Sequence, residues 1–118
     1  MTRKQAREHA FKLIYGLGFD GETPTLDGED DFAVKLYNAV CNNLSEIDEL
    51  IKDSTKNFAF NRIFKTDLAA IRMGIAEIKY VEGEPHAVAI NSAVELAKKF
   101  GTEKSASFVN GVLATVIK

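Results

Sequence analysis

The sequence predicts an all-α protein built from six or seven helices. In each long segment the apolar residues recur at intervals of three and four, which is the period of an amphipathic helix. The stretches between these segments are short or rich in glycine, proline and acidic residues, and no segment has a recognisable strand partner. With 118 residues, of which 46% are hydrophobic, the chain is long enough to bury one core. We therefore expect residues 1–118 to fold as one domain.

The first helix is predicted to begin after Thr2 and to end near Gly16 and Gly18. Thr2 has the side chain of an N-cap, and glycine is a common stop signal. The apolar face of this helix is formed by Ala6, Ala10, Leu13, Ile14 and Leu17. The acidic stretch of residues 18–31 has no periodicity, and we expect a solvated, mobile loop that is dispensable for the core.

Three more helices are predicted in the middle of the chain. The second runs from about Asp31 to Asn42, and the third opens at Ser45, where S-E-I-D has the form of a capping box. Residues 57–64 are predicted to form a short helix or turn. The fourth helix is predicted to be capped near Thr66 and to continue through Ile78.

Two helices complete the chain after a break at residues 83–85. Gly101 has the position of a glycine that ends the first of them, and Ser105 is predicted to cap the second. Asn110-Gly111 is a hairpin signal, but the apolar residues around it keep helical spacing, so we predict a helix. Because glycine costs about 1 kcal/mol of helix propensity, we expect Gly111 to lie where another helix or a partner approaches closely.

Composition and motifs argue against an enzyme, a metalloprotein or a membrane protein. The single cysteine, Cys41, excludes an internal disulfide framework, and no histidine or cysteine pair has the spacing of metal ligands. Glycine-rich nucleotide motifs are missing, so we expect no cofactor. The charged N-terminus is unlike a signal peptide, and no apolar run is long enough to span a bilayer. We therefore expect a cytoplasmic protein without catalytic activity.

The charges are distributed unevenly along a chain whose formal net charge is −2. Residues 1–15 carry +3, whereas residues 16–31 carry −6. One stripe of the first helix combines cations with aromatic rings, namely Lys4, Arg7, Phe11 and Tyr15. Such a combination is typical of sites for single-stranded RNA. The alternative is that both rings belong to the core and the cations only face solvent, and periodicity alone favours this alternative.

Three stretches resemble the NusB family of transcription antitermination factors. The sequence RKQAREHAFKLIY at residues 3–15 is similar to the arginine-rich start of that family. The sequence TDLAAIRMGIAEIKY at residues 66–80 resembles its D-R-x-I-L-R-x-A-x-Y-E-L helix. Residues 85–113, PHAVAINSAVELAKKFGTEKSASFVNGVL, resemble its most characteristic run, which ends in F-V-N-G-V-L. Together the three stretches cover about half of the chain in the family's order.

The resemblance implies two packed three-helix bundles that form one RNA-binding domain over residues 1–118. It implies binding to boxA-type single-stranded RNA of nascent ribosomal transcripts, together with the small-subunit ribosomal protein NusE. The wider complex would contain NusA, NusG and RNA polymerase. The residues expected to contact RNA are Arg3, Lys4, Arg7, Arg72, Lys104 and Phe108. The residues expected on the partner surface are Tyr15, Asp67 and Glu77.

Five positions depart from the family's pattern, and each departure changes a charge. The residues found at these positions are Gln5, Leu68, Ser92, Lys104 and Ala114. Changes of charge at a polar interface weaken steering and register more than they weaken the fold. Two functions therefore stay open: an RNA-binding antitermination factor, and a NusB-fold protein–protein interaction module with weak or lost RNA binding.

The cationic start leads to two further expectations. A patch of three cations on an acidic body should bind RNA weakly alone, so a basic partner facing Asp67 and Glu77 would complete the site. Replacement of Arg3, Lys4 and Arg7 by alanine should weaken RNA binding and leave the stability nearly unchanged, because alanine is a good helix former.

Overall fold

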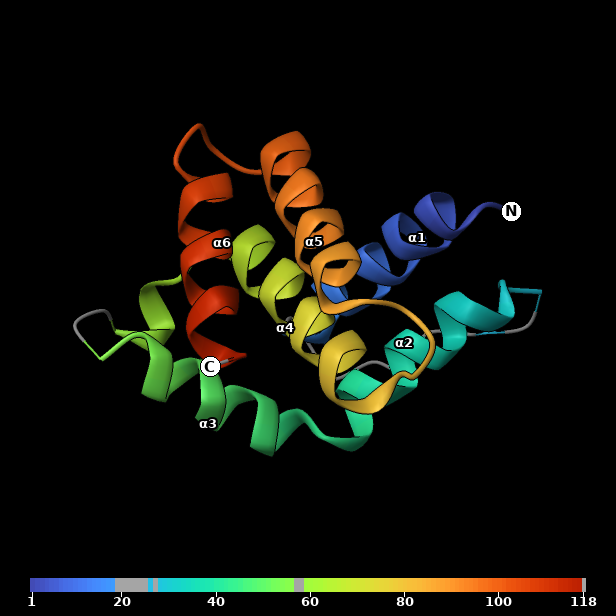
Figure 1. The fold of residues 1–118 in the computed structure, drawn as a ribbon, viewed down its shortest axis with the longest axis horizontal. Helices are drawn as coiled ribbons and strands as arrows, with labels where there is room; N and C mark the ends of the chain where they lie inside the picture. Colours follow the sequence, from blue (N-terminus) through green and yellow to red (C-terminus); the bar gives the residue numbers. More distant parts are fainter. Residues whose placement is uncertain (19–25, 27, 57–58, 118) are drawn as a thin grey trace.

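The computed structural model describes residues 1–18, 26, 28–56 and 59–117 (Figure 1). Within these ranges the chain forms six α-helices and no strand, which confirms the predicted all-α class. The helices are α1 (Arg3–Tyr15), α2 (Asp31–Asn42), α3 (Leu44–Ser54), α4 (Lys65–Tyr80), α5 (His86–Phe100) and α6 (Ser105–Val116). Two short 3₁₀ turns, Gly16–Gly18 and Phe60–Arg62, follow α1 and precede α4. Most of the predicted acidic loop, residues 19–25 and 27, lies outside the described residues.

The helices pack around α4, which crosses the centre of the molecule (Figure 1). Helices α4, α5 and α6 all contact one another and form one three-helix group. Helices α1 and α2 contact each other and also lie against α4, while α3 lies across α4 and α6. The largest fully buried side chains come from every helix except α5 and include Ile14, Leu36, Ile47, Met73 and Leu113.

Three helices begin one or two residues before the position that the sequence predicts. Helix α3 begins at Leu44, so Ser45 lies inside it and the S-E-I-D sequence does not act as its cap. Thr66 likewise lies inside α4, which starts at Lys65. Ser105 is the first residue of α6, and its hydroxyl accepts a hydrogen bond from the Thr102 amide at 2.8 Å. Its cap-like bond therefore closes the α5–α6 turn and does not satisfy an amide of α6.

For a neighbouring helix, the expectation of a close approach at Gly111 is wrong; for a partner, it stays a prediction. A Cβ atom added at Gly111 would meet nothing within 4 Å, because this residue lies on the exposed side of α6. The close approach is found at Gly74 in the middle of α4. There an added Cβ would lie 2.8 Å from a methyl group of Leu113 and 3.4 Å from the Cβ of Ala93. Gly74 therefore allows α5 and α6 to pack on α4.

Two other glycines end helices for different reasons. Gly83 has a φ of 109°, a conformation that favours glycine, and it separates α4 from α5 as predicted. Gly101 ends α5 as predicted, but its φ of −101° requires no glycine. A side chain is excluded there by space, since an added Cβ would lie 2.7 Å from the Ala97 carbonyl oxygen.

Candidate functional site

The cationic start of α1 is held by a capping box. The Gln5 amide donates a hydrogen bond to the Thr2 hydroxyl at 3.1 Å, and the Thr2 amide donates to the Gln5 side-chain oxygen at 2.9 Å. In the NusB pattern a basic residue is common at this position. Gln5 has a structural role there, because its side chain completes the capping box. The T-x-x-Q spacing is the signal that could have indicated it. The cap fixes the backbone from which Arg3 and Lys4 extend.

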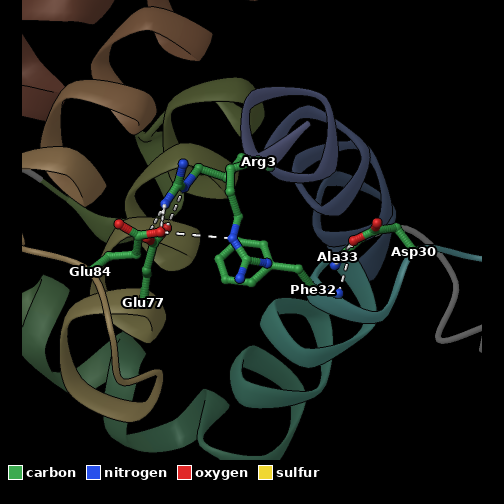
Figure 2. Close-up of polar contacts among 7 residues, drawn as sticks. Arg3, Asp30, Phe32, Ala33, Glu77 and Glu84 are labelled. Carbon is green, nitrogen blue, oxygen red and sulfur yellow. Dashed lines mark hydrogen bonds and ion pairs between the residues drawn. The ribbon is translucent and has the colours of Figure 1, made fainter. Parts of the chain in front are cut away.

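Arg7 is buried in a bidentate ion pair with Glu77 of α4. Its Nε donates to Glu77 Oε1 at 2.9 Å and its Nη2 donates to Oε2 at 2.7 Å, in the network drawn in Figure 2. The two side chains are only 6% and 1% exposed. The hydrogen bond with Glu77 raises the pKa of Arg7 above its usual value, so Arg7 stays charged. The residue expected to contact RNA and the residue expected to contact a partner thus contact each other.

Arg3 remains accessible and lies on an aromatic platform. Its guanidinium carbon is 4.0 Å from the centre of the Phe32 ring, and its side chain is 59% exposed. Figure 2 shows the Arg3 side chain over this ring. Glu84 lies 3.8 Å from a nitrogen of Arg3 and 3.8 Å from a nitrogen of Arg7. The stacking restricts the Arg3 side chain at the surface, where Lys4 is also exposed. Arg3, Lys4 and the buried Arg7 form the N-terminal cluster, and Arg3 and Lys4 are its exposed cations.

The predicted stripe on α1 is interrupted in its middle. Phe11 is buried and stacks on Phe100 of α5, with 5.4 Å between the ring centres. Arg7 is buried as well, whereas Lys4 and Tyr15 are exposed at the two ends of the helix. The reason is that α1 packs against α2, α4 and α5, so its apolar face is wider than the periodicity indicated. For Phe11 the alternative of a core ring is confirmed.

A groove between α1 and α5 extends the N-terminal cluster. Its cavity of about 160 Å³ is lined by Lys4, Arg7, Glu8, Ser92 and Lys99, among others. Glu8 accepts a hydrogen bond from Lys99 at 2.7 Å, and this contact lowers the pKa of Glu8. Ser92 replaces the glutamate of the NusB pattern and therefore leaves the groove with one acid fewer. Lys99 was not singled out from the sequence; its place in the last turn of α5 also suits the helix dipole.

Arg72 is held in a second ion pair and does not extend freely into solvent. Its Nε and Nη2 donate to the two carboxylate oxygens of Asp48 at 3.0 and 2.9 Å. The Arg72 side chain is 11% exposed. The pair joins α4 to α3, so Arg72 acts first of all as a tie between two helices.

A separate cluster lies where α4 and α6 begin. Lys104 is exposed and Phe108 is half-buried, and both line a pocket of about 510 Å³ together with Asp67. Asp67 is only 4% exposed, and its Oδ1 has no hydrogen-bond partner in the described structure. Burial raises the pKa of Asp67, and a hydrogen bond with Ser105 opposes this shift.

Most of the predicted site residues therefore lie in two clusters, whereas Tyr15 and Arg72 lie outside both. Asp67 and Glu77, both expected on a partner surface, are ten residues apart on α4, which is about 15 Å along the helix axis. Neither acid presents its charge at the surface of the free chain. Of the substituted positions, Leu68 is half-buried and packs against the core, and Ala114 is half-buried on α6.

Asp67→Asn is expected to raise the free energy of unfolding at neutral pH. The folded state holds the pKa of Asp67 above that of the unfolded chain, so ionisation of this carboxyl destabilises the fold. The gain should shrink as the pH falls through the folded-state pKa towards the unfolded value of about 3.9. Urea denaturation over a pH series measures it. Asp48→Asn, which weakens the pair with Arg72, is the control and should be destabilising at neutral pH; a loss in both variants would contradict the expectation.

Two features are missing from the part of the chain that the structure describes, namely a membrane-spanning helix and a metal-binding cluster. None of its helices has the length and hydropathy needed to cross a bilayer. No group of three or more histidine, cysteine or acidic side chains in these ranges has an arrangement that could hold a metal ion.

Comparison with known proteins gives consistent matches over almost the whole chain. The model of the NusB family matches residues 4–118. The transcription antitermination protein NusB of Finegoldia magna is 37% identical over 130 aligned positions, which cover 100% of this chain and 95% of the relative. The crystal structure of T. maritima NusB superposes with a TM-score of 0.88 at 27% identity and covers 98% of this chain and 90% of that one. A structure of NusB and NusE in complex with dsRNA gives a TM-score of 0.83 at 28% identity, with 97% and 94% coverage.

Proposed function

The chain belongs to the NusB family, and we propose that it is a transcription antitermination factor that binds boxA-type single-stranded RNA of nascent ribosomal transcripts. It would act as a single domain over residues 1–118 together with a NusE-like small-subunit ribosomal protein, as the complex of NusB, NusE and dsRNA suggests. NusA, NusG and RNA polymerase would belong to the wider complex in the cytoplasm. The role is one of binding, without a chemical step.

The observation that carries this proposal is the arrangement of exposed cations at the capped start of α1. Arg3, stacked on Phe32, and Lys4 beside it would contact phosphates. Arg7 would hold the start of α1 in place through its pair with Glu77, since a buried guanidinium changes its position little when RNA binds. Lys104 and Phe108 offer a further cation and an aromatic ring at the cluster where α4 and α6 begin.

The remaining site residues would act through buried contacts or at the partner surface. Arg72 would hold α3 against α4 and would thereby stabilise the surface that these two helices form. Tyr15, exposed at the last turn of α1, would contact the NusE-like partner directly. Asp67 and Glu77, which are buried side chains of α4, would stabilise the partner surface without being exposed on it. The family's charged residues would thus act partly through the shape that they give to the surface.

The alternative is a protein–protein interaction module with weak or lost RNA binding. It is favoured by the acids that accompany the cations, since Glu84 lies within 3.8 Å of both Arg3 and Arg7, and Glu8 binds Lys99. These contacts reduce the local positive charge. The proposed function therefore includes weak binding by the chain alone and tighter binding when a basic partner is present.

Arg3→Ala combined with Lys4→Ala is expected to weaken RNA binding without a loss of stability. Both side chains are exposed, and alanine favours the helix. Two lost phosphate contacts should flatten the slope of log K against log salt by about 1.4, at about 0.7 per contact on a single strand. Binding to a boxA-like RNA and to a scrambled RNA is measured across a salt series, with and without the NusE-like protein.

Lys52→Ala is the matched control for this experiment. Lys52 is an exposed cation on α3, which lies away from the N-terminus (Figure 1). It should leave both the affinity and the slope unchanged. If the unmodified chain binds the NusE-like protein but binds no RNA under any of these conditions, the protein is an interaction module and the RNA-binding proposal is rejected.

A further inference from the structure

The pocket where α4 and α6 begin contains residues for which the resemblance assigns no role. Its volume of about 510 Å³ is within the range of sites that enclose small ligands. One wall comes from the segment that leads into α4, with Arg62 and Phe64, and the other comes from the start of α6, with Lys104 and Phe108. Residues about forty positions apart in the sequence are thus brought to one hollow.

Phe64 is the most unusual member of this pocket. Its side chain is 60% exposed, although a phenylalanine ring is normally removed from water. It occupies the N-cap position of α4, where it makes no side-chain capping bond, so the start of the helix does not depend on the ring. An exposed ring that lines a cavity beside a second ring, Phe108, is suited to bind a flat ligand.

The charges around the pocket favour an anionic ligand. Arg62 and Lys104 are exposed at its lining, and among the described residues neither forms an ion pair with Glu103, the exposed acid beside them. Asp67 lies in the same lining, and its Oδ1 is a buried acceptor without a partner in the described structure. Buried acceptors are rarely left unsatisfied, and the amino group of a nucleobase is a donor that could satisfy this one.

We propose that Phe64 and Phe108 form a stacking site for an unpaired base of single-stranded RNA, with Arg62 and Lys104 contacting the phosphates next to that base. The proposal rests on the proposed function and adds Phe64 and Arg62 to its RNA surface. Every base has a π-face, so stacking here would fix the path of the strand rather than its sequence. The strand would then be held at two clusters, at the start of α1 and at the start of α6.

Variants of Phe64 test the stacking directly. Phe64→Ala and Phe64→Leu should weaken binding to a boxA-like RNA roughly 5- to 100-fold, the range for loss of one base stacked on an aromatic side chain. Phe64→Tyr, which keeps the ring face, should bind like the unmodified chain. Leucine keeps most of the apolar area, so a loss with leucine identifies the ring and not its hydrophobicity. Thermal unfolding of each variant checks that the fold is retained, as expected for a side chain that is largely exposed.

Charge variants at the rim give effects of opposite sign. Arg62→Gln should weaken RNA binding and flatten the salt slope by about 0.7. Glu103→Gln should strengthen binding, because it removes an acid next to the same phosphates. Similar affinities for the unmodified chain, Phe64→Ala and Phe64→Leu would overturn the proposal. Loss of affinity only for the NusE-like protein would also overturn it, because the pocket would then belong to a protein interface.

The outcomes separate this proposal from the proposed function. If the unmodified chain binds RNA and the Arg3 and Lys4 variant binds less tightly, the function stands whatever the Phe64 variants do. If the unmodified chain binds no RNA with or without the partner, the function and this stacking site are both rejected.

Discussion

Arg7→Ala is expected to lower the free energy of unfolding by about 3–5 kcal/mol, the usual cost of breaking a buried ion pair from one side. The substitution leaves the Glu77 carboxylate in the interior, 1% exposed and without its two donors. A loss of this size is a large part of the total stability of a typical domain. The expectation from sequence, that alanine at Arg7 is harmless, is therefore replaced by its opposite. Urea denaturation followed by circular dichroism measures the change.

The partner variants show whether the unpaired charge is the cause. Glu77→Ala should be similarly destabilising, whereas Arg7→Met combined with Glu77→Leu should recover most of the stability, because no buried charge remains. Arg3→Ala is the matched control, since Arg3 is an exposed arginine one turn earlier on the same helix. A small effect of Arg7→Ala, equal to that of Arg3→Ala, would show that the pair contributes little to the fold.

Leu113→Ala is expected to lower the free energy of unfolding by about 2–5 kcal/mol, because this fully buried side chain fills the junction of α4 and α6. The two methyl groups of Leu113 are also the atoms that a Cβ at Gly74 would meet, at 2.8 and 3.0 Å. Gly74→Ala should therefore be more favourable in the Leu113→Ala background than in the unmodified chain. A double-mutant cycle measures this coupling.

Gly111→Ala provides the control for the glycine effect. It lies in α6 with open space around its Cβ, so alanine should raise stability by about 0.5–1 kcal/mol in either background. Equal effects of Gly74→Ala with and without the Leu113 side chain would show that the close approach has no energetic consequence.

The helices could be predicted from the sequence because their apolar faces are continuous. Helix α2 has the predicted bounds, and its buried residues lie on one continuous face of the helix. The starts of α3 and α4 were displaced because Ser45 and Thr66 have the chemistry of caps, although the backbone already turns into the helix before them. Gly74 and Gly111 could not be distinguished, since the close approach depends on how α5 and α6 cross α4.

The candidate site was predicted less completely, and the reason is the burial of charge. A sequence pattern places arginine and glutamate at the surface, and nothing local indicates that Arg7 and Glu77, or Arg72 and Asp48, lie within bonding distance. Arg3 and Lys4 were identified correctly as exposed cations of the helix start. Phe64 was not identified, because an aromatic residue in front of a helix is more often part of the core.

The pair between Arg7 and Glu77 has a consequence for the order in which a nascent chain acquires its surface. The two residues are 70 positions apart, so at about 5–20 residues per second α4 leaves the ribosome several seconds after α1. Until then α1 lacks the carboxylate that holds Arg7, and Glu84, which lies beside Arg3, is made later still. A contact of such long range also closes late in folding. Ribosome-bound intermediates that end before α4 would therefore carry the N-terminal cations without their folded arrangement.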